Sequence, residues 1–196
     1  MFIDVPDESD LDAGIADWFE RQRGAWGYLP NYALPFARHD DVARAWGALD
    51  KAIRSHMDRR RFEIATIAAA RAYRSTYCVA AHSKFLRDEC GDEQSMRAIA
   101  ADPSGAGLDP TDRAVMDFAT RVALDAAAIT SADVQVLRSH GLNDEEITDV
   151  VFTAAARAFF TKVLDALGVQ ADAQLGQTFD PQVRDQVTVG RPVAEA

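Results

Sequence analysis

The chain has 196 residues, 48% hydrophobic and 27% charged, as is typical of a soluble globular protein. Its formal charge of −10 and pI near 4.8 argue against nucleic acid or an anionic membrane surface as a partner. Two cysteines do not make a disulfide framework, the acidic start MFIDVPDESDLD has no secretory signal, and charges interrupt the alanine-rich runs too often for a bilayer span. We expect a cytoplasmic protein.

The first third of the chain predicts two helices separated by an irregular segment. Residues 1–10 form an acidic lead-in, and a short helix is expected from Leu11 to Arg23. The stretch GAWGYLPNYALP then breaks the helical pattern through its glycines and prolines, and we expect its aromatic rings to pack rather than to bind a ligand. From Pro35 to His56 apolar residues recur at helical spacing. They are Val42, Trp46, Leu49 and Ile53.

Two further helices follow with almost no loop between them. The first begins at Asp58 and ends near Arg74, and the second has Ser75 as its N-cap and runs to about Cys90. Gly91 is a natural C-cap for that helix. A short helix over residues 93–100 precedes the loop DPSGAGLDP.

Strong start signals mark the helices of the second half. Asp109 as N-cap followed by Pro110 predicts a helix to about Leu124. Another is expected from Thr130 to His140. Asn143 with Glu146 resembles a capping box and opens the longest helix, to Leu167, with an apolar stripe. That stripe comprises Ile147, Val150, Val151, Ala154, Ala158 and Phe159.

No segment alternates with a period of two over a useful length, so the predicted fold class is all-α. We expect one domain over residues 1–196 with its core at about 15–176. The motif-bearing half spans about 35–100 and a second helical half about 109–168, which leaves open an arrangement of two related halves. The tail 177–196 is expected to be extended and able to reach across a subunit interface.

The stretch EIATIAAARAYRSTYCVAAH, from Glu63 to His82, carries the candidate chemistry. With Ser75 as N-cap, Cys78 falls at the third helical position, where free N–H groups and the helix dipole favour a thiolate. His82 lies four residues further on the same helix face, where it could lower the pKa of the thiol or take its proton.

Simpler interpretations exist for each of these residues. A lone cysteine in an alanine-rich helix is most often a small buried hydrophobe, and a single histidine is most often a structural residue. Glu63 is the one carboxylate in RRFEIATIAAARAY, and it could pair on the surface with Arg59 or Arg60. If it faces inward it needs a partner, and a nearby imidazole is the least costly one.

The spacing Glu, eleven residues, Ser, two residues, Cys, three residues, His resembles the Glu…Cys-x-x-Cys-x-x-x-His signature of the AhpD-like alkylhydroperoxidases, in the carboxymuconolactone decarboxylase superfamily. The resemblance implies an all-α AhpD-like fold. It implies that Cys78 reacts with peroxide, that His82 is the base and that Glu63 relays protons, with Ser75 and Tyr77 lining the site. Ser75 departs from the family pattern because it stands in place of the first cysteine.

The flanking stretches GYLPNYALPFARHDDVARAW and LRSHGLNDEEITDVVFTAAARAFFTKVLDALGV are similar to the peroxidase-related branch of the same superfamily, so the resemblance covers roughly residues 15–180. It implies an antioxidant oxidoreductase that acts on a small organic hydroperoxide and assembles as a homo-oligomer.

Serine cannot form the resolving disulfide. Cys90 lies about 18 Å along the helix from Cys78, well beyond the roughly 7 Å between Cα atoms that a disulfide allows.

Three routes therefore stay open for Cys78 once it is oxidised. An external thiol reductant resolves it, a cysteine of another subunit does so, or the protein no longer runs a peroxidase cycle and acts as a redox sensor. Decarboxylase or lactone chemistry through His82 and Glu63, independent of the thiol, is an alternative enzyme class. A non-catalytic oligomer is a third class. We expect no cofactor and no metal, because this spacing matches no known zinc site.

Overall fold

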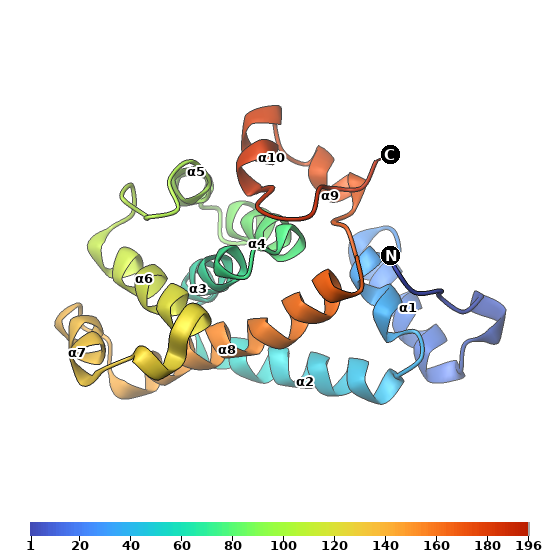
Figure 1. The fold of residues 1–196 in the computed structure, drawn as a ribbon, viewed down its shortest axis with the longest axis horizontal. Helices are drawn as coiled ribbons and strands as arrows, with labels where there is room; N and C mark the ends of the chain where they lie inside the picture. Colours follow the sequence, from blue (N-terminus) through green and yellow to red (C-terminus); the bar gives the residue numbers. More distant parts are fainter. Residues whose placement is uncertain (196) are drawn as a thin grey trace.

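The computed structural model describes residues 1–195 and shows an all-α fold, with no β-strand in that range (Figure 1). The α-helices are α1 (Ala13–Trp26), α2 (Asp40–His56), α3 (Arg59–Ala72), α4 (Thr76–Asp88), α5 (Glu93–Ala101), α6 (Pro110–Asp125), α7 (Ser131–Ser139), α8 (Asp144–Ala166), α9 (Ala173–Gln177) and α10 (Pro181–Val187). Short 3-10 helices lie at Glu8–Asp10, Asn31–Phe36 and Ala126–Ala128. The helices within residues 1–195 are all too short or too polar to cross a membrane.

Helix α3 forms the centre of the molecule, and α4, α6 and α8 pack around it (Figure 1). Every residue from 62 to 70 is buried, so this helix has no solvent face over more than two turns. A helix that is apolar all round is stable only when other helices enclose it. The central position of α3 therefore explains its alanine-rich sequence FEIATIAAA. The same position leaves the one carboxylate of this stretch, that of Glu63, fully buried.

The predicted helix starts are confirmed in the second half of the chain. The Asp109 carboxylate accepts hydrogen bonds from the N–H groups of Thr111 and Asp112, at 2.9 and 3.1 Å, and so begins α6. Asn143 and Glu146 each accept from the other's N–H at 2.9 Å, which is a complete capping box at the start of α8. Side chains thus satisfy amide groups that have no partner within the helix.

Helix boundaries differ from prediction at three places in the first half. Helix α1 begins at Ala13 and continues to Trp26, beyond the predicted end at Arg23. Pro35 belongs to the 3-10 segment Asn31–Phe36 and not to α2, which begins at Asp40. Helix α4 ends at Asp88 rather than at Cys90, and the chain then turns through Gly91, whose φ of 67° is easy only for glycine.

Two apolar stripes also differ from expectation, because parts of them face outward. Leu49 of α2 is 50% exposed and Phe159 of α8 is 44% exposed. Ile53, Ile147 and Val150 are buried as expected for the core sides of these helices.

The C-terminal tail is not extended as predicted, because it contains α10 and the end of α9. Asp180 caps α10 by accepting from the Val183 N–H at 2.9 Å, and Pro181 is its first residue. Beyond α10 the N–H groups of residues 189 and 190 donate to the Thr76 hydroxyl, at 3.1 and 2.9 Å. The tail therefore packs on the start of α4 of its own chain (Figure 1).

The acidic lead-in also lies against its own chain. The Phe2 N–H donates to the Leu167 carbonyl at 2.8 Å, and the Arg191 guanidinium sits over the Phe2 ring at 4.9 Å. Both ends of the chain thus meet near the C-terminal end of α8. A separate small apolar cluster joins α1 to the segment after it, and its buried members are Ile15, Phe19, Ala33 and Ala37.

Candidate functional site

The Cys78 thiol lies in the wall of a cavity of about 400 Å³ enclosed by residues of α1, α2, α3, α4 and α8. Cys78 is the third residue of α4 and is 1% exposed. Eight of its nineteen lining residues carry Phe, Tyr or Trp rings, so the cavity is suited to a small organic molecule. Those rings belong to Trp18, Trp26, Tyr32, Trp46, Phe62, Tyr77, Phe85 and Phe160.

Glu63 and His82 form a buried pair between α3 and α4. The His82 Nδ1 atom lies 2.6 Å from a Glu63 carboxylate oxygen, and the other oxygen is 2.6 Å from the Arg59 Nε atom. Both pairings that the sequence left open for Glu63 therefore occur together. A carboxylate with no exposure is stable because two partners compensate its charge.

Arg157 of α8 is the functional residue that sequence reasoning missed. It is 4% exposed and donates from one terminal nitrogen to His82 Nε2 at 3.1 Å and from the other to the Asp50 carboxylate at 2.6 Å. Its guanidinium lies over the rings of Trp46 and Phe160, at 5.0 and 5.7 Å. The sequence VVFTAAARAFFTK does indicate a buried charge, because Arg157 is the lone charged residue in the apolar run before the final lysine.

The hydrogen bond from Arg157 also fixes the protonation pattern of His82. A guanidinium can only donate, so His82 Nε2 accepts and the ring proton sits on Nδ1, which donates to Glu63. In this arrangement the Nε2 lone pair points toward Arg157.

The thiol is not predisposed to ionise, contrary to the sequence-based expectation. The pKa of Cys78 is raised to about 11, mainly by burial. The Arg157 charge and the nearby Ser75 hydroxyl lower this pKa, and the Asp165 charge raises it. The favourable effect of the N-terminus of α4 on the Cys78 thiolate is smaller than the cost of removing that thiolate from water. Arg157, and not His82, is the cation that most favours the thiolate.

Ser75 occupies the N-cap position of α4 as predicted, but its hydroxyl makes no capping hydrogen bond. The side chain is fully buried, and its oxygen has no hydrogen-bond partner of good geometry among residues 1–195. The residue that replaces the first motif cysteine is therefore a buried hydroxyl beside the Cys78 thiol.

Tyr77 lines the cavity with its ring while its hydroxyl lies among other polar groups. The hydroxyl donates to the Asp172 carboxylate and accepts from the Tyr32 N–H at 3.3 Å. Burial raises the pKa of Tyr77, and the Asp172 charge raises it further. Tyr77 thus anchors the start of α4 to the segments around Asn31 and Asp172, because Asp172 also accepts from the Asn31 N–H at 2.7 Å.

Comparison with known proteins shows which proteins this chain resembles. The model of the carboxymuconolactone decarboxylase family matches residues 40–102, which include Glu63, Cys78 and His82. The structure is similar to the AhpD-core, peroxidase-related protein of Ralstonia eutropha JMP134, with a TM-score of 0.80 and 25% identity over 89% of this chain and 93% of that one. The chain is thus similar to the carboxymuconolactone decarboxylase family over residues 40–102 and to AhpD-core structures over most of its length.

Two further solved structures extend the comparison. An uncharacterized peroxidase-related protein of Silicibacter sp. TM1040 is 26% identical over 89% of this chain and 93% of that one, with a TM-score of 0.79. The debrominase Bmp8, in complex with 2,3,4-tribromopyrrole, is 18% identical over 95% of this chain and 97% of that one, with a TM-score of 0.76, and shows the shared fold. A search of the curated proteins finds no match.

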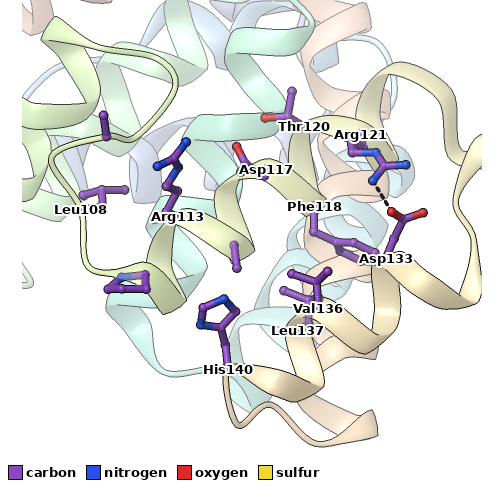
Figure 2. A pocket seen from close by; sticks show the side chains of 13 residues that line it. Leu108, Arg113, Asp117, Phe118, Thr120, Arg121, Asp133, Val136, Leu137 and His140 are labelled. Carbon is purple, nitrogen blue, oxygen red and sulfur yellow. Dashed lines mark hydrogen bonds and ion pairs between the residues drawn. The ribbon is translucent and has the colours of Figure 1, made fainter.

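A second hollow, of about 790 Å³, lies between α6 and α7 (Figure 2). Arg121 and Asp133 form an ion pair at its rim, and Arg113, Asp117 and His140 also line it. It holds no cysteine and no buried acid–histidine pair, so the chemistry of Cys78 belongs to the smaller cavity. Residues 1–195 contain no group of three or more His, Cys, Asp or Glu side chains placed to share a metal ion.

Proposed function

We propose that this protein reduces small organic hydroperoxides through the Cys78 thiol and returns to the reduced state with an external thiol. The observation that carries the proposal is one thiol in an aromatic cavity that also holds a buried acid–histidine pair and a buried arginine. Nucleophile, base and orienting acid are the three components of an activated thiol site. The similarity of the chain to two peroxidase-related proteins of known structure supports the same function.

The first step is removal of the thiol proton. His82 Nε2 takes this proton after its hydrogen bond to Arg157 opens, and Glu63 stabilises the resulting imidazolium through Nδ1. The Arg157 N–H group released from His82 then faces the cavity and can stabilise the thiolate. Because burial raises the pKa of Cys78, the thiol stays protonated and protected until a ligand brings about this exchange.

The second step transfers one oxygen atom. The thiolate sulfur attacks the terminal oxygen of the hydroperoxide, the O–O bond breaks, and the alkoxide that leaves takes the proton from the His82 imidazolium. Cys78 becomes a sulfenic acid and the hydroperoxide becomes an alcohol. The sulfur is oxidised by two electrons and the peroxide is reduced by two.

Resolution of the sulfenic acid needs a thiol from outside the motif, because Ser75 has no sulfur. One external thiol displaces water from the sulfenic acid and forms a mixed disulfide with Cys78, and a second thiol displaces Cys78 and leaves an external disulfide. Cys78 and Cys90 are both free in this structure. Cys90 lies beyond the far end of α4, whereas Cys78 lies in its first turn, which favours an external reductant over an internal disulfide.

Intact-mass analysis after brief exposure to stoichiometric cumene hydroperoxide, with and without a sulfenic-acid trap, tests this function. We expect the wild type and Cys90→Ser to gain one trap molecule and Cys78→Ser to gain none. His82→Gln should form the adduct at least about tenfold more slowly, since general-base catalysis contributes at least that much. A free, unmodified Cys78 after exposure would contradict the proposal.

A thiol-independent acid–base reaction is the second candidate, and the raised pKa of Cys78 is the observation that favours it. Glu63 and His82 would then move a proton on a carboxylated or lactone substrate, as the family model suggests. Turnover of such a substrate that survives Cys78→Ala and is lost in His82→Ala would support this candidate. The reverse pattern, with hydroperoxide as substrate, would support thiol chemistry.

A further inference from the structure

The wall of the thiol cavity carries more cations than acids. Arg54 of α2, Arg59 of α3 and Arg157 of α8 line the cavity, and Asp50 of α2 is the one acid among its lining residues within positions 1–195. The chain as a whole has a formal charge of −10. Cations gathered in one cavity of an acidic protein therefore favour an anion at this place, whereas most of the surface repels it.

Two of these three arginines already have a carboxylate partner. The Arg157 guanidinium donates to Asp50 at 2.6 Å, and the Arg59 Nε atom lies 2.6 Å from a Glu63 oxygen. Arg54 makes no ion pair with any residue in the described range 1–195. Asp50 precedes Arg54 by one helical turn, but its carboxylate is bound to Arg157. Arg54 is therefore the lining cation whose charge is not compensated by the protein.

This cation and the thiol lie toward different ends of the cavity. Arg54 and Arg59 stand on either side of the short turn between α2 and α3. The Arg59 guanidinium lies over the Phe85 ring at 5.6 Å. Phe85 follows Cys78 by seven residues on α4, which is about 10 Å along the helix axis. Between the two ends the wall is mainly aromatic, so it suits the apolar middle of an elongated molecule.

We propose that Arg54 binds a carboxylate of the small molecule that enters the cavity, so that the preferred hydroperoxides are those of organic acids. A guanidinium binds a carboxylate through two parallel N–H···O bonds. The peroxide then lies at Cys78 and the carboxylate toward the turn between α2 and α3. This substrate class rests on the proposed function, whereas binding of a carboxylate at Arg54 does not require the thiol to react.

The charge balance of the cavity favours a carboxylate over other groups. One uncompensated guanidinium matches a single negative charge, so a doubly charged phosphate would keep a charge without a partner. A neutral hydroperoxide would leave Arg54 unpaired, and a cationic one would be repelled by it. Arg54 is partly buried, so solvent and salt screen an ion pair there less than a pair on the open surface.

Calorimetric titration with para-tert-butylbenzoate and para-tert-butylbenzamide tests carboxylate binding without any reaction. We expect the wild type to bind the carboxylate at least about tenfold more tightly than the amide, as one charge-assisted pair provides. Arg54→Gln should lose this preference and Arg54→Lys should keep part of it. Arg44→Gln is the matched control, because Arg44 is exposed on the same helix and pairs with Asp40 outside the cavity. Equal binding of the two compounds, binding of neither, or a preference that survives in Arg54→Gln would overturn the proposal.

Cumene hydroperoxide and its para-carboxylate derivative test the substrate class. The readout is the ratio of the two rates at which Cys78 gains a sulfenic-acid trap, so a general change in thiol reactivity cancels. We expect the wild type to favour the carboxylate at least about tenfold and Arg54→Gln to remove most of this preference. Equal rates in the wild type would overturn the inference and leave the proposed function intact. If neither compound modifies Cys78, the proposed function fails, and the calorimetric result decides the role of Arg54.

Discussion

The Cys78 thiol is one end of a connected set of buried polar groups. Arg157 joins the carboxylate of Asp50 to the His82 ring, and His82 joins Arg157 to Glu63. These side chains come from four helices, α2, α3, α4 and α8, so the set exists only in the folded molecule. Arg157 controls both the base, by occupying its lone pair, and the thiol, by its charge.

Sequence reasoning identified part of this set, for a physical reason. Glu63 and Arg157 are both lone charges in apolar runs, a pattern that requires a buried partner. Glu63 stands out as the one carboxylate in an apolar run at motif spacing from Cys78 and His82, whereas Arg157 lies 75 residues from its partner His82, beyond any local pattern. The pKa of Cys78 could not be predicted, because position within a helix does not give depth of burial.

We expect Arg157→Gln to slow alkylation of Cys78 by iodoacetamide about tenfold or more at pH 8. Removing the cation that lowers the pKa of Cys78 leaves burial unopposed, so this pKa rises and the thiolate fraction falls. The pH dependence of the alkylation rate measures the effect directly. Arg157→Lys should recover part of the rate, and Arg138→Gln, an exposed arginine on α7, should have none of the effect. Equal rates for wild type and Arg157→Gln would refute the assignment.

The buried thiol should also make stability depend on pH in the alkaline range. The pKa of Cys78 is raised from 9.0 to about 11, so between these values the unfolded chain loses a proton that the folded chain keeps. The free energy of unfolding therefore falls as pH rises from about 9 to 11, by up to about 2–3 kcal/mol at 1.36 kcal/mol for each pKa unit. The free energy of unfolding of the wild type, measured in urea, should fall between pH 8 and pH 11 relative to that of Cys78→Ser. An equal change with pH in the two proteins would contradict burial of the Cys78 thiol.

At the scale of whole elements, the tail contains a helix start like that of α6. Asp109-Pro110 predicts the start of α6, and Asp180-Pro181 has the same two residue types and begins α10. The second signal is weak because the surrounding segment is short and polar, and a helix of seven residues is stable only through its contacts with other elements. Those contacts, with α4 and α5, cannot be deduced from the local sequence.

Docking of the tail depends on a close backbone approach at Gly190. A Cβ atom at this position would collide with the Arg74 carbonyl oxygen, and the Gly190 N–H donates to the Thr76 hydroxyl at 2.9 Å. We expect Gly190→Ala to release the end of the tail and to accelerate its cleavage in limited proteolysis. Gly24→Ala is the matched control, because Gly24 lies within α1 with open space around it and alanine there should stabilise the helix by about 0.5–1 kcal/mol. Equal cleavage of the two variants would refute this account.

At the scale of the whole molecule, α3 joins the two helical halves that the sequence predicts. Arg60 pairs with Asp92 before α5 and with Asp112 of α6, and Arg61 pairs with Glu146 of α8 at 2.7 Å. The existence of the helices follows from local caps and periodicity. Their arrangement around α3 follows from pairings between residues as far as 85 positions apart, which one sequence does not reveal.

The Asp112 carboxyl at this junction should give the molecule a stability that decreases with pH in the acidic range. The pKa of Asp112 is raised to about 6. Burial makes the largest contribution, Asp109 also raises this pKa, and Arg60 lowers it. The folded protein therefore holds a proton that the unfolded chain loses near pH 4, and the free energy of unfolding falls as pH rises from about 4 through 6. The full shift corresponds to about 3 kcal/mol, and because solvent reaches the Asp112 site from the Arg60 side, the cost of burying the charge is smaller and we expect about 1–2 kcal/mol.

Asp112→Asn removes this titration and keeps the shape of the side chain. Urea unfolding at pH 4, 5, 6 and 7 should show the wild type losing about 1–2 kcal/mol relative to Asp112→Asn across that range, because every other carboxyl group titrates in both proteins. The sign is decisive, since a carboxylate stabilised mainly by Arg60 would have a lowered pKa and would make the wild type gain relative stability with pH. A gain would mean that the ion pair with Arg60 outweighs burial at the junction of the two halves.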